Sequence, residues 1–151
     1  MKALRLTAGK SEPTFEDVPD PDPGPGQVTV RIGGAGACHS DLHLMYEFEP
    51  GALPWGPPFT LGHENAGWID AVGPGVTGLE TGQPVAVYRP WGCGGCRRCR
   101  LGMENYCERQ AEIGVFGGGL GQDGGMAPRM LVPQARWVVP LADLDPVSAA
   151  P

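Results

Sequence analysis

The sequence has little positive charge, and this scarcity narrows the possible functions. Only 11 of its 151 residues are Lys or Arg, against 17 Asp and Glu, which gives a net charge of −6. Such a chain has little nonspecific attraction to nucleic acid or to anionic lipid. No apolar run approaches the length of a membrane span, and residues 1–20 lack the apolar core of a signal peptide. We therefore expect a cytoplasmic protein with no nucleic-acid and no membrane partner.

Internal repeats, blocks of like charge and coiled-coil heptads are also absent, which leaves one ordinary globular domain as the simplest interpretation. Glycine and proline are abundant, with 25 and 17 residues, a level at which chains without periodicity begin to look disordered. The hydrophobic content of 41% and the four Trp argue against disorder. We therefore interpret the glycines and prolines as turn residues.

Short apolar segments separated by turn signals predict a mainly β fold, either an antiparallel barrel or a sandwich. The expected strands are Lys2–Leu6, Val28–Ile32, Gly67–Val72, Pro84–Tyr88, Met130–Val132 and Trp137–Val139. The segment Pro23–Gly26 predicts a turn before the second of these strands. A short helix is expected over Asp41–Phe48, which lacks Gly and Pro, with Ser40 as its N-cap.

Four of the five cysteines are concentrated in one segment. Cys93, Cys96, Cys99 and Cys107 have the spacing C-x2-C-x2-C-x7-C, which lets a tight loop present four thiolates to one tetrahedral ion. Because four protein ligands leave no open position, we expect a structural zinc site in a lobe at about residues 90–110. Free thiols or disulfides, and iron in place of zinc, are the alternatives, since thiolates also bind iron.

A second group of potential metal ligands surrounds the remaining cysteine, Cys38. This cysteine opens the segment Cys38–His43, which also holds two imidazoles, a hydroxyl and a carboxylate. Further along, His63 follows a glycine and precedes a carboxylate. Cys38 and His63 could be two ligands of a catalytic zinc, with Asp41 accepting the other ring N–H of His63. For either ligand by itself, a role in the buried core is the more ordinary interpretation.

Taken together, these motifs resemble those of the zinc-dependent medium-chain alcohol dehydrogenases. The resemblance rests on Cys38–Asp41, on Gly62-His63-Glu64-x2-Gly67-x5-Gly73-x2-Val76 and on the four-cysteine lobe, and it covers essentially the whole chain. It implies that residues 1–151 form a GroES-like barrel with short helices and a zinc-binding lobe, the catalytic domain. An NAD(P)-binding Rossmann domain would follow residue 151.

The resemblance also implies an activity, the reversible oxidation of primary or secondary alcohols to aldehydes or ketones with NAD(P). Zinc lowers the pKa of a bound hydroxyl, from about 16 to about 7 in the case of water, so a bound alcohol can lose its proton at neutral pH. The alkoxide can then transfer hydride to the nicotinamide. The implied partners are a small-molecule alcohol or carbonyl substrate, and further copies of the parent chain in a homodimer or homotetramer.

Individual roles follow from the same resemblance. Cys38 and His63 would bind the catalytic zinc, Asp41 would orient His63, Ser40 would contact the substrate hydroxyl, and His43 would pass its proton toward solvent. The family's third zinc ligand, a Cys or Asp, would fall just after the last residue of this chain.

Four further residues have less specific roles. Glu64 would lie behind the catalytic metal, and His39 stands where some relatives carry a cation near the pyrophosphate of the cofactor. Trp55 and Leu120 are candidate walls of an apolar substrate pocket, although each would suit the core equally well.

The string Gly119-x-Gly121-x-x-Gly124 matches the dinucleotide-binding fingerprint, but its surroundings argue against that function. Gly117 and Gly118 precede it in place of a buried strand, and Pro128 follows where a helix should open. We therefore expect a glycine loop, and neither a cofactor site nor a complete catalytic metal shell within these residues. A nonenzymatic zinc-binding domain, a truncated fragment that is inactive by itself, and a zinc-ribbon-like adaptor remain alternatives to a dehydrogenase.

Overall fold

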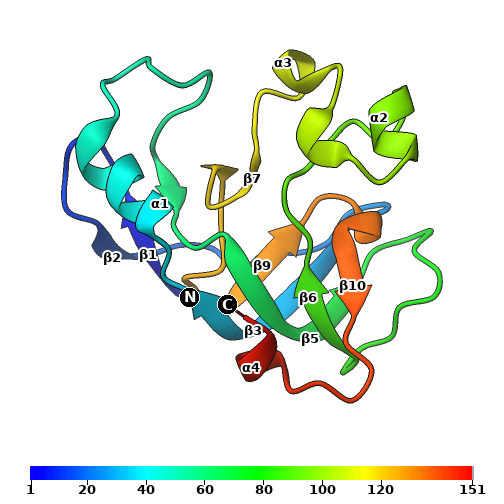
Figure 1. Ribbon diagram of the computed structural model, residues 1–151. Helices are drawn as coiled ribbons and strands as arrows, with labels where there is room; N and C mark the ends of the chain where they lie inside the picture. The colour runs from blue at the N-terminus through cyan, green and yellow to red at the C-terminus, as the bar shows by residue number, and fades with distance from the viewer. Residues whose placement is uncertain (151) are drawn as a thin grey trace.

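The computed structural model describes residues 1–150, and its largest element is a five-stranded antiparallel sheet (Figure 1). Its strand order is β10-β6-β5-β3-β9, formed by Val138–Pro140, Pro84–Val87, Glu64–Val72, Val28–Gly36 and Arg129–Val132. The β-branched side chains of Val28, Val30, Ile69 and Val85 are almost fully buried in the apolar core of this sheet. Such residues pack well on a pleated surface, which is why these segments were recognisable as strands.

A smaller sheet has the strand order β2-β1-β4, formed by Thr14–Asp17, Lys2–Leu6 and Phe59–Thr60. A second apolar cluster joins this sheet to the helical segment after β3, and it includes Leu6, Leu44, Phe59 and Leu61. Leu61 also donates its backbone N–H to the carbonyl of Leu4 in β1, at 3.0 Å. The cluster therefore holds the helical segment against residues 59–61, which lead into β5.

The helices are short. They are α1 (His39–Leu42), the π-helix His43–Glu47, α2 (Arg97–Arg100), the 3-10 helices Glu104–Tyr106 and Ala135–Trp137, α3 (Gln110–Ile113) and α4 (Pro146–Ala149). A minimal parallel pair, β7 (Gly117–Gly118) and β8 (Gly121–Gln122), completes the elements. In Figure 1, α1 lies at the upper left and α2 at the upper right, with β7 between them. Within residues 1–150, no helix has the length and hydropathy needed to cross a membrane.

The prediction of a mainly β fold is confirmed, with differences at the strand ends. β1 coincides with its predicted range, whereas β3 continues to Gly36 and β5 begins at Glu64. These two extensions pair with each other, so they depend on ladder hydrogen bonds that local sequence does not reveal.

The exposed strand β2 was missed, and the predicted strand start at Trp137 is the end of a 3-10 helix. Across residues 1–150 the strands pair as separate sheets and do not close into one barrel.

The helix starts at His39, two residues before the predicted start at Asp41, and the predicted cap is wrong. Cys38 is the N-cap of α1, and Ser40 lies inside the first turn. The carboxylate of Asp41 accepts a hydrogen bond from the backbone N–H of Cys38 at 3.0 Å, which secures the helix start in place of Ser40. After Leu42 the chain widens into the π-helix, in which Phe48 N–H donates to the carbonyl of His43. Such widened turns recur at functional sites, and this one begins at His43.

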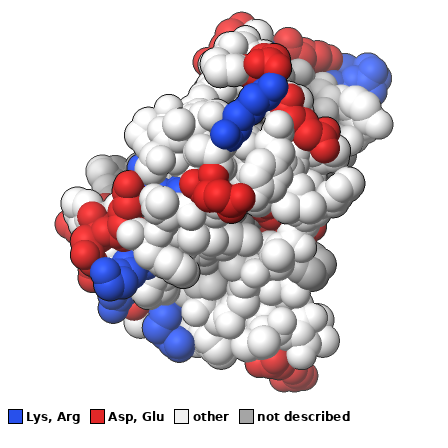
Figure 2. Space-filling model, turned by 90° about the vertical axis from the view of Figure 1, so that its left-hand side faces the viewer, with Lys and Arg blue, Asp and Glu red and all other residues white. Residues whose placement is uncertain are grey.

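Charges of both signs are interspersed on the surface next to β1 and β2. Figure 2 shows the face seen from the left of Figure 1, where acidic and basic side chains lie among large uncharged areas. Lys2 pairs with Asp17 at 3.2 Å, and Arg5 pairs with Asp123 at 2.7 Å. These basic side chains are therefore neutralised by neighbouring carboxylates.

Candidate metal centres and substrate pocket

The four cysteines of the lobe converge on one point. The Sγ atoms of Cys93, Cys96, Cys99 and Cys107 all lie within 4.8 Å of one another. The thiols are free, and the Sγ atoms of Cys93 and Cys99 are 3.9 Å apart, nearly twice the length of a disulfide bond. A tetrahedral zinc with Zn–S bonds of about 2.3 Å separates its sulfurs by about 3.8 Å. The sulfur arrangement therefore fits one tetrahedral metal ion.

Backbone N–H groups point at these sulfurs and affect their ionisation. Cys96 N–H donates to Cys93 Sγ at 3.3 Å, and Cys99 N–H donates to Cys96 Sγ at 3.4 Å. Burial opposes ionisation of Cys93 most strongly, but the N–H groups of Cys96 and Gly95, together with Cys107 and Arg109, outweigh it and lower the pKa of Cys93 to about 6. Burial raises the pKa of Cys99 to about 12. The loop therefore favours one thiolate before any metal binds, whereas Cys99 would release its proton on binding.

A buried carboxylate that the sequence analysis missed attaches the lobe to the sheet. Glu104 accepts hydrogen bonds from Gly92 N–H at 2.6 Å and from Trp137 Nε1 at 3.0 Å, and it also pairs with Arg136. Trp137 stacks on Trp91 with ring centroids 4.6 Å apart, and both rings belong to the core of the five-stranded sheet. Glu104 therefore fixes the position of the lobe relative to that core. In the sequence it looks like one more solvated charge in a polar loop.

The second group of potential ligands lies where the ends of β3 and β5 are paired. Cys38 follows β3, His63 immediately precedes β5, and Gly36 lies opposite Glu64 in the ladder. Cys38 Sγ, a ring nitrogen of His63 and a carboxylate oxygen of Glu64 lie within 4.8 Å of one another. The structure thus brings together the two residues that the sequence predicts as catalytic ligands and Glu64, which the family resemblance implies behind the metal.

His63 is buried, and its ring nitrogens have no hydrogen-bond partner among residues 1–150. Nδ1 lies 3.4 Å from Asp41 Oδ1, an ion-pair distance longer than a normal hydrogen bond, and Nε2 is left without a partner. An unpartnered buried nitrogen is costly, so the donor set fits a metal ion.

Burial most strongly lowers the pKa of His63, but Asp41 and Cys38 outweigh it and raise the pKa overall. Arg89 acts against protonation, so its charge lies within electrostatic range of His63.

The environment of Cys38 also suits a metal ligand. The backbone N–H of Ser40 has the largest effect in lowering the pKa of Cys38, and the Ser40 hydroxyl and His63 add to it. Cys38 Sγ lies 3.6 Å from Ser40 Oγ. These contacts favour the thiolate, which is the form that binds metal.

A cavity of about 240 Å³ opens next to Ser40. Its polar lining comes from Ser40, His43 and Arg89, and its other walls are Leu44, Phe48, Leu53, Trp55, Pro90, Phe116 and Leu120. Trp55 and Leu120 therefore line the pocket as predicted, and they also pack in the second apolar cluster. His43 Nδ1 lies 2.5 Å from Glu47 Oε2. His39 lines a different cavity, of about 470 Å³, which also contacts Cys38 and Asp41.

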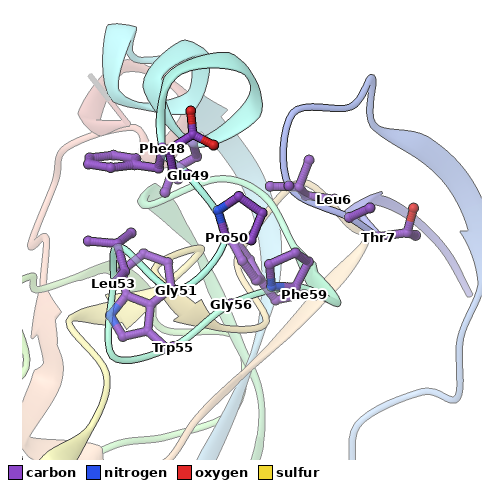
Figure 3. A pocket seen from close by; sticks show the side chains of 14 residues that line it. Leu6, Thr7, Phe48, Glu49, Pro50, Gly51, Leu53, Trp55, Gly56 and Phe59 are labelled. Atoms are coloured by element: carbon purple, nitrogen blue, oxygen red, sulfur yellow. The ribbon is translucent and has the colours of Figure 1, made fainter.

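A further cavity of about 320 Å³ adjoins the first and is drawn in Figure 3. Both cavities are lined by Leu44, Phe48, Leu53 and Trp55. In Figure 3, Leu53 and Trp55 lie on one side of the cavity and Leu6 on the other. These shared side chains therefore form the wall between the two cavities.

The glycine string packs against the segment that carries His63. Gly124 N–H donates to the carbonyl of Thr60 at 2.8 Å, and Gly125 N–H donates to that of Gly62 at 3.0 Å. A Cβ added at Gly124 would lie 2.1 Å from the Gly62 carbonyl oxygen, so only glycine permits this approach. The expected glycine loop is confirmed, and it supports His63 from behind.

Comparison with protein families identifies the domain. Residues 24–143 match the family described as the alcohol dehydrogenase GroES-like domain. The chain belongs to this family. The matched range includes both groups of potential metal ligands, so the resemblance seen in the sequence is confirmed for the fold and the family.

Similar proteins are longer than this GroES-like domain. The D-arabinose 1-dehydrogenase (NADP(+)) of Saccharolobus solfataricus is 42% identical over 142 residues, which are 93% of this chain and 39% of that protein. An NAD-dependent alcohol dehydrogenase of Sulfurisphaera tokodaii is 39% identical, over 100% of this chain and 44% of its own length. A structure of cobalt and zinc bound thermostable alcohol dehydrogenase from Pyrobaculum aerophilum has a TM-score of 0.84 and 35% identity, covering 99% of this chain and 44% of that one. The chain thus spans less than half the length of these relatives.

Two charged residues of this GroES-like domain were missed in the sequence analysis. Arg89 follows β6 and lines the cavity, and nothing in its local sequence indicates this position. Glu47 ends the π-helix and contacts His43 from outside the cavity lining. The spacing of four residues within the predicted helix could have indicated that contact.

Proposed function

We propose that this chain is the catalytic domain of a zinc-containing, NAD(P)-dependent alcohol dehydrogenase that interconverts alcohols and aldehydes or ketones. The proposal is carried by buried His63, whose unpartnered Nε2 lies near Cys38, beside a pocket lined by Ser40 and His43. Family membership and the names of the similar proteins support an oxidoreductase over a nonenzymatic zinc-binding domain.

Two zinc ions would have different ligand sets. The four lobe thiols would hold a structural ion, because they fill a tetrahedral shell and leave no place for substrate. Cys38, His63 and a third ligand from residues after Pro151 would hold the catalytic ion, with Glu64 behind it. A zinc bound there supplies Lewis acidity that lowers the pKa of the substrate hydroxyl.

The side chains of the pocket would hold the substrate and carry its proton. The Ser40 hydroxyl can accept the proton of the substrate and donate its own toward His43, since both line the same cavity. Glu47 bonds to Nδ1 of His43 at the surface, where the proton can pass to solvent. Asp41 keeps the His63 ring in place, and the apolar walls exclude water from the reacting atoms.

The rest of the enzyme would lie outside these residues. A Rossmann domain after residue 151 would bind NAD(P), and His39 would lie near the cofactor pyrophosphate. The parent would act on small alcohols or carbonyl compounds in the cytoplasm as a homodimer or homotetramer. Residues 1–151 alone should be inactive, because hydride transfer requires a nicotinamide held against the substrate.

The test uses the full-length protein and follows NAD(P)H absorbance with a panel of primary and secondary alcohols. The wild type should turn over at least some of them, and His63→Ala should reduce turnover to background while the lobe keeps about one zinc per chain. Ser40→Ala should impair turnover more than zinc content. Near-normal turnover by His63→Ala would show that the catalytic metal lies elsewhere.

A further inference from the structure

Arg89 has no ion-pair or hydrogen-bond partner among residues 1–150, although it lines the same cavity as Ser40 and His43. Apart from His43, it is the only side chain in that lining that can carry charge, and no carboxylate is present in the lining. The two carboxylates that flank the lining residue Phe48 are engaged elsewhere, Glu47 with His43 and Glu49 with Lys10. Arg89 is exposed, so the cavity is lined by a solvated cation that has no carboxylate partner among residues 1–150.

The stem of Arg89 is held by packing. A Cβ added at Gly117 would lie 3.2 Å from Cγ of Arg89, so the stem runs over the backbone of that glycine. The stem is packed while the side chain as a whole is exposed, so the guanidinium can reach a ligand in the cavity that Arg89 lines.

A second donor in the same lining also lacks an acceptor. Trp55 Nε1 is buried and has no hydrogen-bond partner among residues 1–150. In Figure 3 the Trp55 indole lies beside Leu53, at the wall shared by the two cavities. The lining thus holds the cation Arg89 and no carboxylate, which is complementary to an anionic ligand.

We propose that Arg89 binds a carboxylate of the substrate, so that this dehydrogenase prefers hydroxy acids and oxo acids to neutral alcohols and carbonyl compounds of the same size. The inference rests on the proposed function and names its substrate class. The planar guanidinium matches a carboxylate through two parallel charge-assisted hydrogen bonds. One arginine in a cavity of about 240 Å³ whose remaining walls, apart from Ser40 and His43, are apolar suits a single negative charge on a short apolar body.

The test measures steady-state kinetics of the full-length enzyme on matched substrate pairs. Glycolate, lactate and longer ω-hydroxy acids are each compared with the isosteric amide, which keeps the shape and removes the charge. The wild type should have a higher kcat/KM for the acid of at least one pair. Arg89→Gln should reduce that acid-to-amide preference about ten- to hundredfold, mainly through KM, as expected for the loss of a charged hydrogen bond.

Two further variants separate charge from structure. Arg89→Lys keeps the charge without the planar fork, and should retain an intermediate preference. Arg100→Gln makes the same charge change at an exposed position of α2 outside the cavity, and should leave the preference unchanged.

The outcomes distinguish this inference from the proposed function. Turnover of neutral alcohols without a preference for any acid would overturn the role of Arg89 and leave the dehydrogenase intact. Equal losses for acids and amides in Arg89→Gln would assign Arg89 to the cofactor or to the fold and also overturn the inference. Absence of turnover with every alcohol, acid and amide would overturn both.

Discussion

The two ligand groups of this domain differ in how their side chains are brought together. The lobe draws its four thiols from one short loop, and backbone N–H groups of that loop bond to the sulfurs. The other group draws Cys38 and His63 from the ends of two strands, and their distance depends on the register of β3 against β5. The lobe can therefore be recognised from spacing alone, whereas the pocket site requires the whole sheet.

The two groups also differ in completeness. Four thiols fill a tetrahedral shell, whereas Cys38, His63 and Glu64 offer three ligands, and Cys38 lies 3.6 Å from Ser40, which lines the cavity of about 240 Å³. We therefore expect the first metal to stabilise the fold and the second to act on substrate. The four predictions below test this difference, from the largest expected effect to the smallest.

Replacing Cys99 by Ser should abolish tight zinc binding by the lobe, because structural zinc sites contribute on the order of 10 kcal/mol in small zinc domains. The lobe should loosen while the five-stranded sheet stays folded. Zinc analysis and circular dichroism measure the two effects. Cys38→Ser is the matched control and should leave the lobe zinc in place. Equal zinc content in Cys99→Ser and wild type would remove the distinction between the groups.

Replacing Glu104 by Ala should detach the lobe from the core, because Trp137, Arg136 and Gly92 all lose their acceptor. We expect a loss of about 2–3 kcal/mol in the free energy of unfolding, measured with denaturant. Glu108→Ala, at an exposed position of the same lobe, is the control and should have little effect. Similar stabilities for both variants would show that Glu104 does not anchor the lobe.

Replacing Gly124 by Ala should disturb only the pocket side, because the added Cβ would collide with the Gly62 carbonyl. The expected loss of stability is about 1–3 kcal/mol, and the zinc content of the lobe should not change. Gly56→Ala, also outside helices and strands, places a Cβ in open space and is the control for the loss of glycine's backbone freedom. A variant as stable as Gly56→Ala would mean that the glycine loop does not support His63.

Replacing Asp41 by Asn in the full-length protein should weaken the metal held by His63 by roughly 10- to 100-fold, the usual effect of losing the carboxylate behind a histidine ligand. Competition with a chelator measures this affinity, and the lobe zinc serves as the internal reference. Asp143→Asn, which is exposed and outside both groups, should change neither site. Loss of the lobe zinc in Asp41→Asn would contradict the independence of the two centres.

The parts that could be predicted from sequence are those fixed by local spacing or local residue type. The cysteine repeat predicts the converging thiols, and the β-branched runs predict the centres of β3 and β5. The strand extensions that meet at Gly36 and Glu64 could not be predicted, since only their mutual pairing stabilises them. The proximity of Cys38 and His63 was expected from the family resemblance, because nothing in their own neighbourhoods requires it.

Residues that act through tertiary contacts were missed for the same reason. Glu104 and Arg89 read as solvated charges, yet one anchors the lobe and the other lines the pocket. The capping residue was misassigned because Ser is a common N-cap, whereas here the Asp41 carboxylate reaches back to Cys38. Residue preferences at helix ends could not decide between Ser40 and Cys38 as the N-cap.

The central claim, one closed and one open metal centre, is tested most directly by zinc content together with X-ray absorption at the zinc edge. Residues 1–151 should hold about one tightly bound zinc with four sulfur ligands, since only the lobe offers a complete shell. The full-length protein should hold about two zinc ions, and the ligand set averaged over both should include nitrogen as well as sulfur. Iron in the lobe, or no metal with all five thiols freely titratable in the native protein, would contradict the account.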